Sequence, residues 1–257
     1  MIEHWRQLHW TMAEKEALAY SGIRKIVGDL QFEIPGEDFH TDLTFEDLGY
    51  SATAKFNQLK RNYWNQESVD KALEKLLSRK GSNHASASIR MQAGDKDSRS
   101  SGFCMQNMTI TVCRERGYVD MHYRSTEVSM KFLADLVFLA RMLPPLLKQL
   151  GVTLQVVRFK FANAFMSALY QPVFLRYEPD IGKFYSHLKE VDPKFVKTYA
   201  RASYPYLLDT HNYGYKMTIR MIGYAKAHVT KKKLDSLKPF YIGLRPDIIE
   251  EDEGEDE

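Results

Sequence analysis

Cysteine is scarce in this chain. Its 257 residues include two, Cys104 and Cys113, which is too few for the disulfide framework of a small secreted domain. The eight histidines are scattered without the spacing of metal ligands, so the sequence predicts no zinc site. It also contains no glycine-rich phosphate loop and no dinucleotide-binding fingerprint. We therefore expect a cytoplasmic protein with two reduced thiols and no metal.

Long apolar runs are also missing. The most apolar stretch, 132–150, is interrupted by Asp135, Arg141 and a proline pair, whereas a membrane-spanning helix needs roughly 20 apolar residues in succession. The N-terminal residues lack the basic segment and the apolar run of a signal peptide. The sequence thus predicts a protein that neither crosses a membrane nor is secreted.

The charged residues are unevenly distributed. Seven of the last eight residues, 250–257, are acidic, and without them 36 basic residues stand against 26 acidic ones. A body this basic suits a phosphorylated ligand or a nucleic acid, and the acidic tail could compete for the same surface. A disordered, solubilising end is the simpler interpretation of the tail.

The hydrophobic patterns that are present predict an α+β protein with a sheet flanked by helices. We expect an amphipathic helix over 1–20, one or two strands over 22–39, a helix over 68–79 with Ser68 as its N-cap, a central helix over 126–150 and a strand over 154–161. The segment 41–64 is ambiguous. We divide the chain into a core over 1–177, an extension packed on it over 178–249, and a disordered acidic tail over 250–257.

Two strands in the middle of the chain direct a thiol and a guanidinium towards one sheet. Apolar and polar residues alternate over 107–112, residues 114–117 form a hairpin turn, and 118–123 is the returning strand. Cys104 precedes the first strand and Arg124 follows the second. This geometry makes a nucleophile beside an anion-binding group feasible, although a buried core cysteine is the commoner finding.

The spacing of Cys104, Arg124-Ser125 and Asp135 resembles the core of the thymidylate synthase superfamily, especially its phage branch, the deoxycytidylate hydroxymethylases. The resemblance covers about residues 68–165. It implies a thymidylate-synthase-like fold with a mixed sheet and a long central helix, and a homodimer packed sheet to sheet. It also implies a pyrimidine nucleoside monophosphate as substrate and 5,10-methylenetetrahydrofolate as one-carbon donor. In the phage branch, which works in the host cytoplasm, the usual purpose is DNA modification.

The resemblance assigns roles to the thiol and to the phosphate-binding pair. Cys104 would add to carbon 6 of the pyrimidine, and its ionisation needs positive charge nearby, which Arg124 could supply. Arg124 and Ser125 would bind the 5′-phosphate, since a guanidinium pairs bidentately with oxyanions. The alternatives are a buried core cysteine for Cys104 and a solvated strand-end side chain, beside Glu127, for Arg124.

Asp135 lies among apolar residues of the central helix, where a buried carboxylate requires a partner. The resemblance makes it the residue that recognises the base. A carboxylate accepts the amino group of cytosine and is repelled by the corresponding carbonyl of uracil, so Asp135 favours a cytidylate. The alternative is a structural ion pair with Lys131 or Arg141.

Two more site residues are assigned by their positions in the resemblance. Glu46 is the best match to the catalytic glutamate that relays protons to the ring, and Asn163 lies where the family contacts the ring or its water network. Phe165 and Ser167 depart from the pattern, because the family has a histidine and a tyrosine there that hold the sugar 3′-hydroxyl. Recognition of the sugar is therefore expected to differ.

The expected function is one-carbon transfer to carbon 5 of a pyrimidine nucleotide, foremost the folate-dependent hydroxymethylation of a cytidylate (dCMP), with methylation as the variant. A rival hypothesis is a catalytically degenerate relative that binds a nucleotide, a nucleic acid or a protein partner without turnover. A third is a nucleic-acid-binding factor that uses the interleaved tyrosines and basic residues of 199–233.

Overall fold

The fold is that of a computed structural model, which describes residues 1–21, 24–48, 50–79, 84–91, 104–167, 174 and 177–195. It is an α+β protein with a six-stranded mixed sheet of order β1-β2-β6-β5-β4-β3, which confirms the expected fold class. The chain forms two compact units. The first comprises residues 1–5 and 27–165, and the second comprises residues 6–26 and 166–257.

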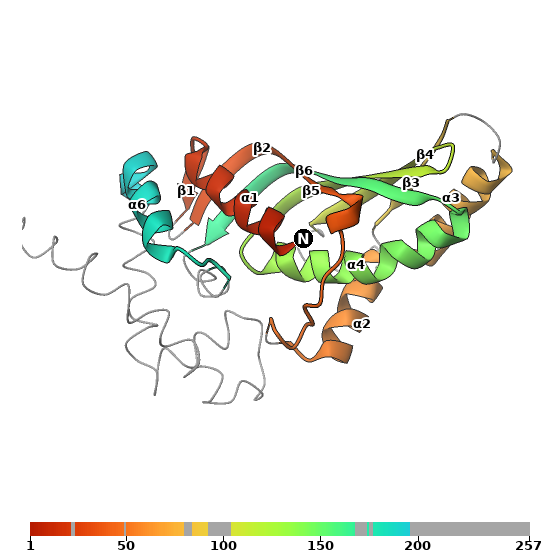
Figure 1. The fold of residues 1–257 in the computed structure, drawn as a ribbon, viewed down its shortest axis with the longest axis horizontal. Coiled ribbons are helices and arrows are strands. Elements are labelled where there is room, and N and C mark those ends of the chain that lie inside the picture. Colours follow the sequence, from red (N-terminus) through yellow and green to blue (C-terminus); the bar gives the residue numbers. More distant parts are fainter. Residues whose placement is uncertain are drawn as a thin grey trace, which may run out of the picture. The chain divides into compact units, whose positions relative to one another are not determined.

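The elements are labelled in Figure 1. The helices are α1 (Ile2–Glu14), α2 (Ala52–Tyr63), α3 (Gln66–Ser78), α4 (Lys131–Leu150) and α6 (Ile181–Val191), with a 3-10 turn, η1, at Gly36–Asp38. The strands are β1 (Ala19–Ser21), β2 (Arg24–Pro35), β3 (Ala85–Arg90), β4 (Met105–Cys113), β5 (Arg116–Glu127) and β6 (Thr153–Ser167).

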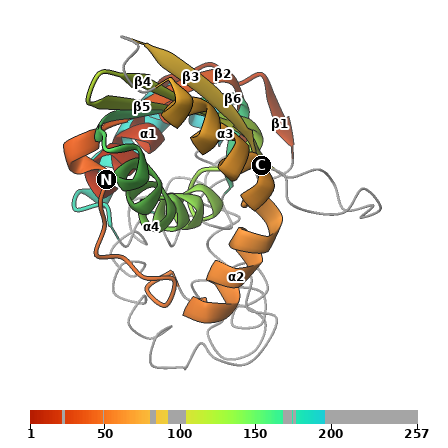
Figure 2. The same ribbon diagram turned by 90° about the vertical axis from the view of Figure 1, so that its right-hand side faces the viewer.

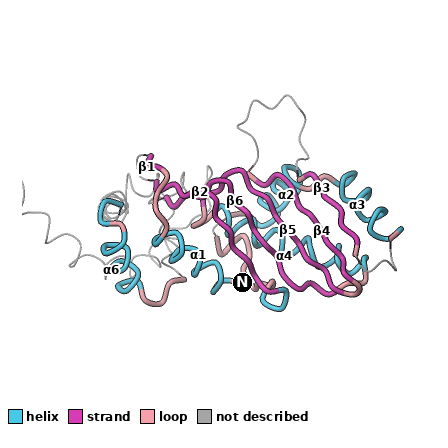
Figure 3. The backbone as a smooth tube through the Cα atoms, turned by 90° about the horizontal axis from the view of Figure 1, so that it is seen from above, coloured by secondary structure: helices cyan, strands magenta, loops and turns pink. Residues whose placement is uncertain are grey.

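The strands of the first unit lie side by side, as Figure 3 shows. Strands β3, β4 and β5 pair antiparallel, and β5 pairs parallel with β6. The expected hairpin joins β4 to β5 through a two-residue turn, in which Arg114 has a φ of 56°. Because β5 and β6 are parallel neighbours, they need a crossover connection, and α4 provides it.

Helix α4 covers one face of this sheet (Figure 2). The ring of Phe132, near the start of the helix, lies 5.7 Å from that of Tyr123 on β5, and 5.1 Å from those of Phe159 and Phe161 on β6. Alternate residues point to the other face, which is polar. On that face, Oδ1 of Asp120 lies 3.7 Å from Nη1 of Arg158 and 4.0 Å from Nζ of Lys160.

The central helix begins later than its sequence predicts, at Lys131 rather than at residue 126. The preceding residues continue strand β5 as far as Glu127, whose fully buried carboxylate accepts the backbone N–H groups of Ser129, Met130 and Lys131. These donors would otherwise be unsatisfied at a helix start. Burial raises the pKa of Glu127, and the three donors oppose that rise.

Helix α3 corrects a second boundary. Its N-cap is Asn65, which accepts the backbone N–H of Ser68 at 3.0 Å, so Ser68 lies within the helix and does not cap it. The hydroxyl of Ser68 instead accepts the backbone N–H of Arg90 at the end of β3, also at 3.0 Å. Either side chain can cap a helix, so sequence alone does not choose between them.

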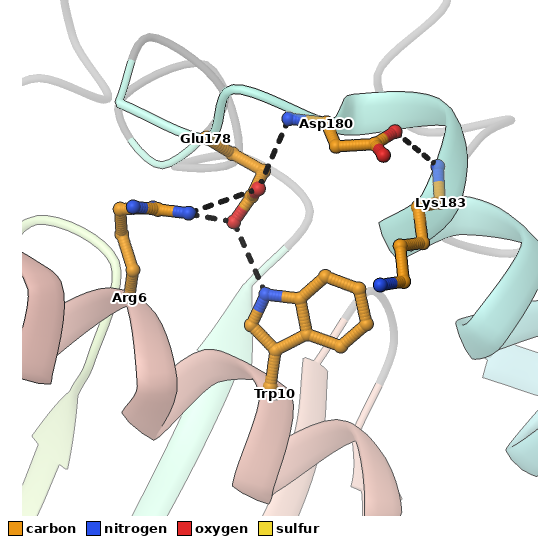
Figure 4. A network of polar contacts seen from close by, with 5 residues as sticks. All are labelled: Arg6, Trp10, Glu178, Asp180 and Lys183. Atoms are coloured by element: carbon orange, nitrogen blue, oxygen red, sulfur yellow. Dashed lines mark hydrogen bonds and ion pairs between the residues drawn. The ribbon is translucent and has the colours of Figure 1, made fainter.

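The second unit contains most of α1, strand β1 and α6, and two buried polar clusters hold it together. In one, shown in Figure 4, the carboxylate of Glu178 accepts hydrogen bonds from Arg6, Trp10 and the backbone of Asp180. In the other cluster, Nζ of Lys25 forms an ion pair with Oδ2 of Asp192 at 2.7 Å. Of the expected extension over 178–249, residues 178–195 are described; the remainder, the segment 199–233 within it and the tail over 250–257 lie outside the described residues.

Candidate functional site

Cys104 lies immediately before β4 and is half-buried. Its backbone carbonyl accepts the N–H of Arg124 at 2.8 Å, which continues the pairing of the β4–β5 hairpin beyond the last paired residues. The hairpin therefore places the thiol and the guanidinium on neighbouring residues of adjacent segments. The charge of Arg124 acts on the thiol of Cys104.

Asp135, the expected base-recognising residue, is a buried carboxylate. It lies on the sheet-facing side of α4 and is 4% exposed, among side chains that are otherwise apolar. Within the described residues it forms no ion pair shorter than 4.0 Å, and Arg141 lies instead over the ring of Phe45, at 5.1 Å. Burial raises the pKa of Asp135 from its ordinary 3.8 to about 7, against the opposing charges of Lys55 and Lys131.

Two tyrosines enclose this carboxylate and the thiol. Tyr63, the last residue of α2, forms hydrogen bonds with the backbone and the thiol of Cys104. Tyr123 on β5 is 2% exposed, and its hydroxyl forms no hydrogen bond of regular geometry within the described residues. The hydroxyl is close enough to Asp135 to act as a weak hydrogen-bond partner, which lowers the pKa of that carboxyl, and burial raises the pKa of Tyr123 itself.

The electrostatics of the thiol differ from the expectation. Burial raises the pKa of Cys104, and the carboxylate of Asp135 raises it further. Lys131, Arg124 and the hydroxyl of Tyr63 act in the opposite direction, as expected for Arg124, but they do not outweigh burial. The thiol is therefore protonated at neutral pH in the free protein.

A lysine from α2 completes the cluster. Lys55 is half-buried, its Nζ lies 4.3 Å from the centroid of the Tyr50 ring, and it donates to the side chain of Gln58 at 3.4 Å. Burial lowers the pKa of Lys55, whereas the carboxylate of Asp135 raises it. We call Cys104, Asp135, Tyr63, Tyr123, Lys55, Lys131 and Arg124 the thiol–carboxylate site.

Ser125 and Asn163 lie next to each other beside this site. They are paired in the register of β5 and β6, one step beyond the pair Tyr123 and Phe161, and both are half-buried. Because side chains alternate along a strand, Ser125 and Asn163 share the α4 side of the sheet with Tyr123. By the same alternation the exposed Arg124 points to the opposite face.

Glu46, the expected proton relay, is not among the groups that act on the pKa of the Cys104 thiol. It is exposed, and its Oε1 accepts the backbone N–H of Ala52 at 3.1 Å, at the first residue of α2. This is the position of a residue that stabilises a helix start. Phe165 and Ser167 follow Asn163 on β6, where Phe165 is half-buried and Ser167 is fully buried.

Sequence reasoning missed Lys55, Tyr63 and Tyr123. Lys55 and Tyr63 are eight residues apart, about two helical turns, so a helix over this segment brings both to nearby positions of one side. That helix was not recognised because its segment has few apolar residues. The sequence places Tyr123 on a strand, but without the position of Asp135 it does not distinguish the hydroxyl of Tyr123 from that of any other strand tyrosine.

Two general features bear on the chemistry. The described residues contain no group of three or more His, Cys, Asp or Glu side chains that could hold a metal ion. None of the helices over these same ranges is long and apolar enough to span a membrane.

The sequence matches no protein-family model and no curated protein.

Proposed function

We propose that the protein transfers a one-carbon unit to carbon 5 of a pyrimidine nucleotide, by hydroxymethylation of a cytidylate. One observation carries the proposal: the thiol of Cys104 and the carboxyl of Asp135, whose pKa is about 7, act electrostatically on each other beside the buried hydroxyl of Tyr123, which forms no hydrogen bond of regular geometry. A buried polar group that lacks a protein partner costs free energy unless a ligand or a water satisfies it.

The protonation state of Asp135 is compatible with cytosine as the base. With a pKa of about 7, this carboxyl is available in its neutral form near neutral pH. A neutral carboxylic acid donates its O–H to N3 of cytosine and accepts the exocyclic amino group on its carbonyl oxygen. Uracil presents an N–H and a carbonyl at the same two positions, which a neutral carboxyl turned by half a rotation also satisfies, so discrimination against uracil depends on the ionised, acceptor-only form of Asp135.

The two acidic groups also suit the first chemical step. Each disfavours ionisation of the other, so the pair shares one proton over a range of pH. Movement of that proton from sulfur to Asp135 yields the thiolate and the carboxylic acid together. The thiolate then forms a bond to carbon 6, the ring electrons move towards N3, and the proton of Asp135 passes to N3.

The remaining steps occur at carbon 5. This carbon would form a bond to the one-carbon unit as the bond between that unit and its carrier nitrogen breaks, and water would supply the hydroxyl of the exocyclic carbon. The protons on carbon 5 and on N3 would leave, and the sulfur–carbon bond would break to restore the thiolate. Carbon 5 thus exchanges hydrogen for a hydroxymethyl group. Ser125 would donate its hydroxyl to the phosphate, whereas the expected partner Arg124 points to the opposite face of β5 and would contribute its charge rather than a shared contact. Asn163, beside Ser125, would contact the ring.

The one-carbon donor enters the proposal only through the resemblance. The carboxyl of Asp135 and the hydroxyl of Tyr123 are groups that would meet the edge of a pyrimidine, and no described residue points in the same way to 5,10-methylenetetrahydrofolate. When bound, this folate would supply a carbon at the oxidation level of formaldehyde. A homodimer would pair the polar sheet faces that carry Asp120, Arg158 and Lys160, and sedimentation of the protein tests this.

Release of tritium from carbon 5 of labelled dCMP, with CMP and dUMP as comparisons and folate present, tests the proposal. We expect release from dCMP that is abolished in Cys104→Ala and retained in Cys113→Ala, because adduct formation at carbon 6 requires one particular thiol. Release from dUMP alone would show that Asp135 does not select cytosine. No release from any of the three nucleotides would reject the transferase.

The second candidate is a relative that binds a nucleotide without turnover. The raised pKa of Cys104 and the placement of Phe165 and Ser167 on β6 favour it, because neither side chain reproduces a histidine or a tyrosine that holds a sugar. Saturable binding of dCMP that Asp135→Ala weakens, together with no tritium release, is the outcome expected for this candidate.

A further inference from the structure

The face of strands β3–β6 opposite α4, which we call the outer face, carries polar side chains that the proposed chemistry mostly does not use. Figure 2 shows α4 on one side of the sheet, and Figure 3 shows the four strands side by side. Alternate residues of each strand point to the outer face, away from the core. The side chains of Arg158 and Lys160 on it are 42% and 46% exposed, so a ligand can reach them.

The charge of the outer face is predominantly positive. The acidic residue that points outward over these four strands is Asp120, whereas five basic residues do so: Arg90, Arg116, Arg124, Arg158 and Lys160. Oδ1 of Asp120 lies 3.7 Å from Arg158 and 4.0 Å from Lys160, distances of weak surface ion pairs. Arg158 also lies 3.8 Å from Glu33 on β2. The excess of cations makes the outer face complementary to a polyanion.

Three of the basic residues gather at one end of this face. The strand register aligns a row across β3, β4, β5 and β6, in the order Arg90, Asn107, His122 and Lys160. Arg124 follows His122 by two residues on the same side of β5. Three gaps of about 4.8 Å between strands span about 14 Å, the length of roughly four stacked nucleotides of one strand. The row therefore offers cations along a path that fits a phosphate backbone.

Two hydroxyl pairs lie beside this row. Oγ of Ser88 lies 3.0 Å from Oγ1 of Thr109, and Oγ of Ser86 lies 3.2 Å from Oγ1 of Thr111. The hydrogen bond within each pair uses one O–H group, so the second O–H can donate outward. Phosphate and sugar oxygens accept such donors without regard to base sequence. The hydroxyls therefore suit the backbone of a nucleic acid.

An aromatic contact on the same face suits unpaired bases. The guanidinium of Arg158 lies over the ring of Tyr118, 5.8 Å from its centroid. Unpaired bases stack on tyrosine rings and on guanidinium planes. The bases of a duplex are already stacked on one another, so this contact favours a single strand.

We propose that the outer face binds single-stranded nucleic acid, with phosphates along the row from Arg90 to Lys160 and bases towards Tyr118. This function goes beyond the proposed transfer, because it uses the face of the sheet opposite Asp135 and requires no turnover.

A second copy of the chain is the competing occupant, since the homodimer of the proposed function would close the same face. The centre of a homodimer interface is mostly apolar and poor in charged residues. The middle row of the outer face instead holds Thr109, Asp120 and Arg158. This composition favours a polyanion over a second copy.

Fluorescence anisotropy of a labelled oligothymidylate of about twelve nucleotides tests the proposal. This probe contains no cytosine, the base that we propose for the Asp135 site. We expect Lys160→Gln and Arg90→Gln each to weaken binding about fivefold at about 0.1 M salt, and to reduce the slope of log K against log salt by about 0.7. The double variant should lose about 25-fold. Lys60→Gln, at an exposed position of α2, should have no effect.

Three results would overturn the proposal. Full binding by the double variant would put the nucleic acid on another surface, such as that of 199–233. Tighter binding of a duplex of the same length would exclude the preference for a single strand. A dimer in sedimentation that binds no oligonucleotide would show that a second copy covers the face. Because neither Arg90 nor Lys160 takes part in the proposed transfer, failure here leaves tritium release from dCMP unaffected.

Discussion

Buried carboxylates in the two units have very different surroundings. In the second unit, Asp192 accepts hydrogen bonds from Lys25, Tyr20 and the backbone of Phe195, and Glu178 is equally well provided with donors. In the first unit, Asp135 has no ion pair among the described residues, and its pKa rises to about 7. A protein that can satisfy a buried carboxylate so completely in one place leaves another under-satisfied, which is typical of a site kept ready for a ligand.

Glu127 shows that the lack of partners is particular to Asp135 and is not shared by every buried carboxylate of the first unit. It too is fully buried in that unit, yet three backbone N–H groups donate to its carboxylate. Asp135 lies eight residues later, in the interior of α4, where the backbone N–H groups are used within the helix. Side chains or a ligand must therefore supply its partners.

Breaking the Lys25–Asp192 pair should give the largest change in stability. The ammonium of Lys25 is 1% exposed and also donates to the carbonyl of Ala13 at 2.9 Å. Lys25→Met would leave a buried charge without its counter-ion, and we expect a loss of about 3–5 kcal/mol in the free energy of unfolding, measured by urea denaturation. Lys15→Met, at an exposed position, is the control. A loss below about 1 kcal/mol would remove the contrast with Asp135.

Asp135→Asn should raise the free energy of unfolding, whereas Lys25→Met lowers it. Between about pH 4 and pH 7 the folded protein retains the proton of Asp135 whereas the unfolded chain has lost it, so stability falls as the pH rises through this range. A shift from 3.8 to about 7 corresponds to about 4 kcal/mol as an upper bound. We expect Asp135→Asn to be more stable than the wild type by up to this amount at about pH 8, and nearly equal to it at about pH 4.

Urea denaturation over that pH range provides the measurement. The wild type should lose stability towards pH 7, whereas the slope of the variant should be smaller by the contribution of one proton. If Asp135→Asn is less stable at every pH, the carboxylate is a structural group like Asp192. The comparison between the two units would then fail.

Loss of one donor to Glu178 should have an intermediate effect. Trp10 donates to this carboxylate at 3.1 Å and packs edge-on against Phe184 at 5.1 Å. Trp10→Phe keeps an aromatic ring and removes the donor, so we expect a loss of about 1–3 kcal/mol in the free energy of unfolding. Trp64→Phe is the matched variant, since Trp64 donates to the neutral side chain of Gln66. An equal loss in both variants would show that the charge of Glu178 does not matter.

The sequence predicts the fold where local patterns act alone. The alternation over 107–112 and the turn that follows it correspond to the β4–β5 hairpin. The boundaries that were misplaced depend on tertiary contacts. Asn65 and Ser68 can both cap a helix. The hydroxyl of Ser68 accepts the backbone N–H of Arg90, which is distant in sequence, so Asn65 caps the helix. Glu127 extends a strand because its carboxylate is buried at the start of α4.

The site is predicted in part for the same reason. Asp135 is conspicuous in sequence, because a carboxylate within an apolar helix requires an explanation. The raised pKa of Cys104 cannot be predicted from the sequence, since it depends on how deeply the thiol is buried and on the carboxylate of Asp135 nearby. Lys55 and Tyr63 reach the site only through the packing of α2 on α4, which no short-range pattern contains.

Tyr123→Phe should produce the smallest change and gives the sharpest comparison. Both this residue and Tyr20 carry a hydroxyl near an aspartate, but that of Tyr20 donates to Asp192 at 2.8 Å and that of Tyr123 has no partner among the described residues. Removing an unpartnered buried hydroxyl is neutral or stabilises the fold by about 1 kcal/mol, whereas Tyr20→Phe should lose about 1–3 kcal/mol.

The ring contacts of Tyr123 with Phe132 and Phe161 remain available to phenylalanine, so urea denaturation of the two variants reports mainly on the hydroxyls. If the unpartnered hydroxyl serves a ligand, Tyr123→Phe should also weaken binding of dCMP while its unfolding free energy is maintained. A loss of stability equal to that of Tyr20→Phe would mean that the hydroxyl of Tyr123 is satisfied in solution. Its role would then be structural, because the free energy of a hydrogen bond cannot be both used in folding and kept for a ligand.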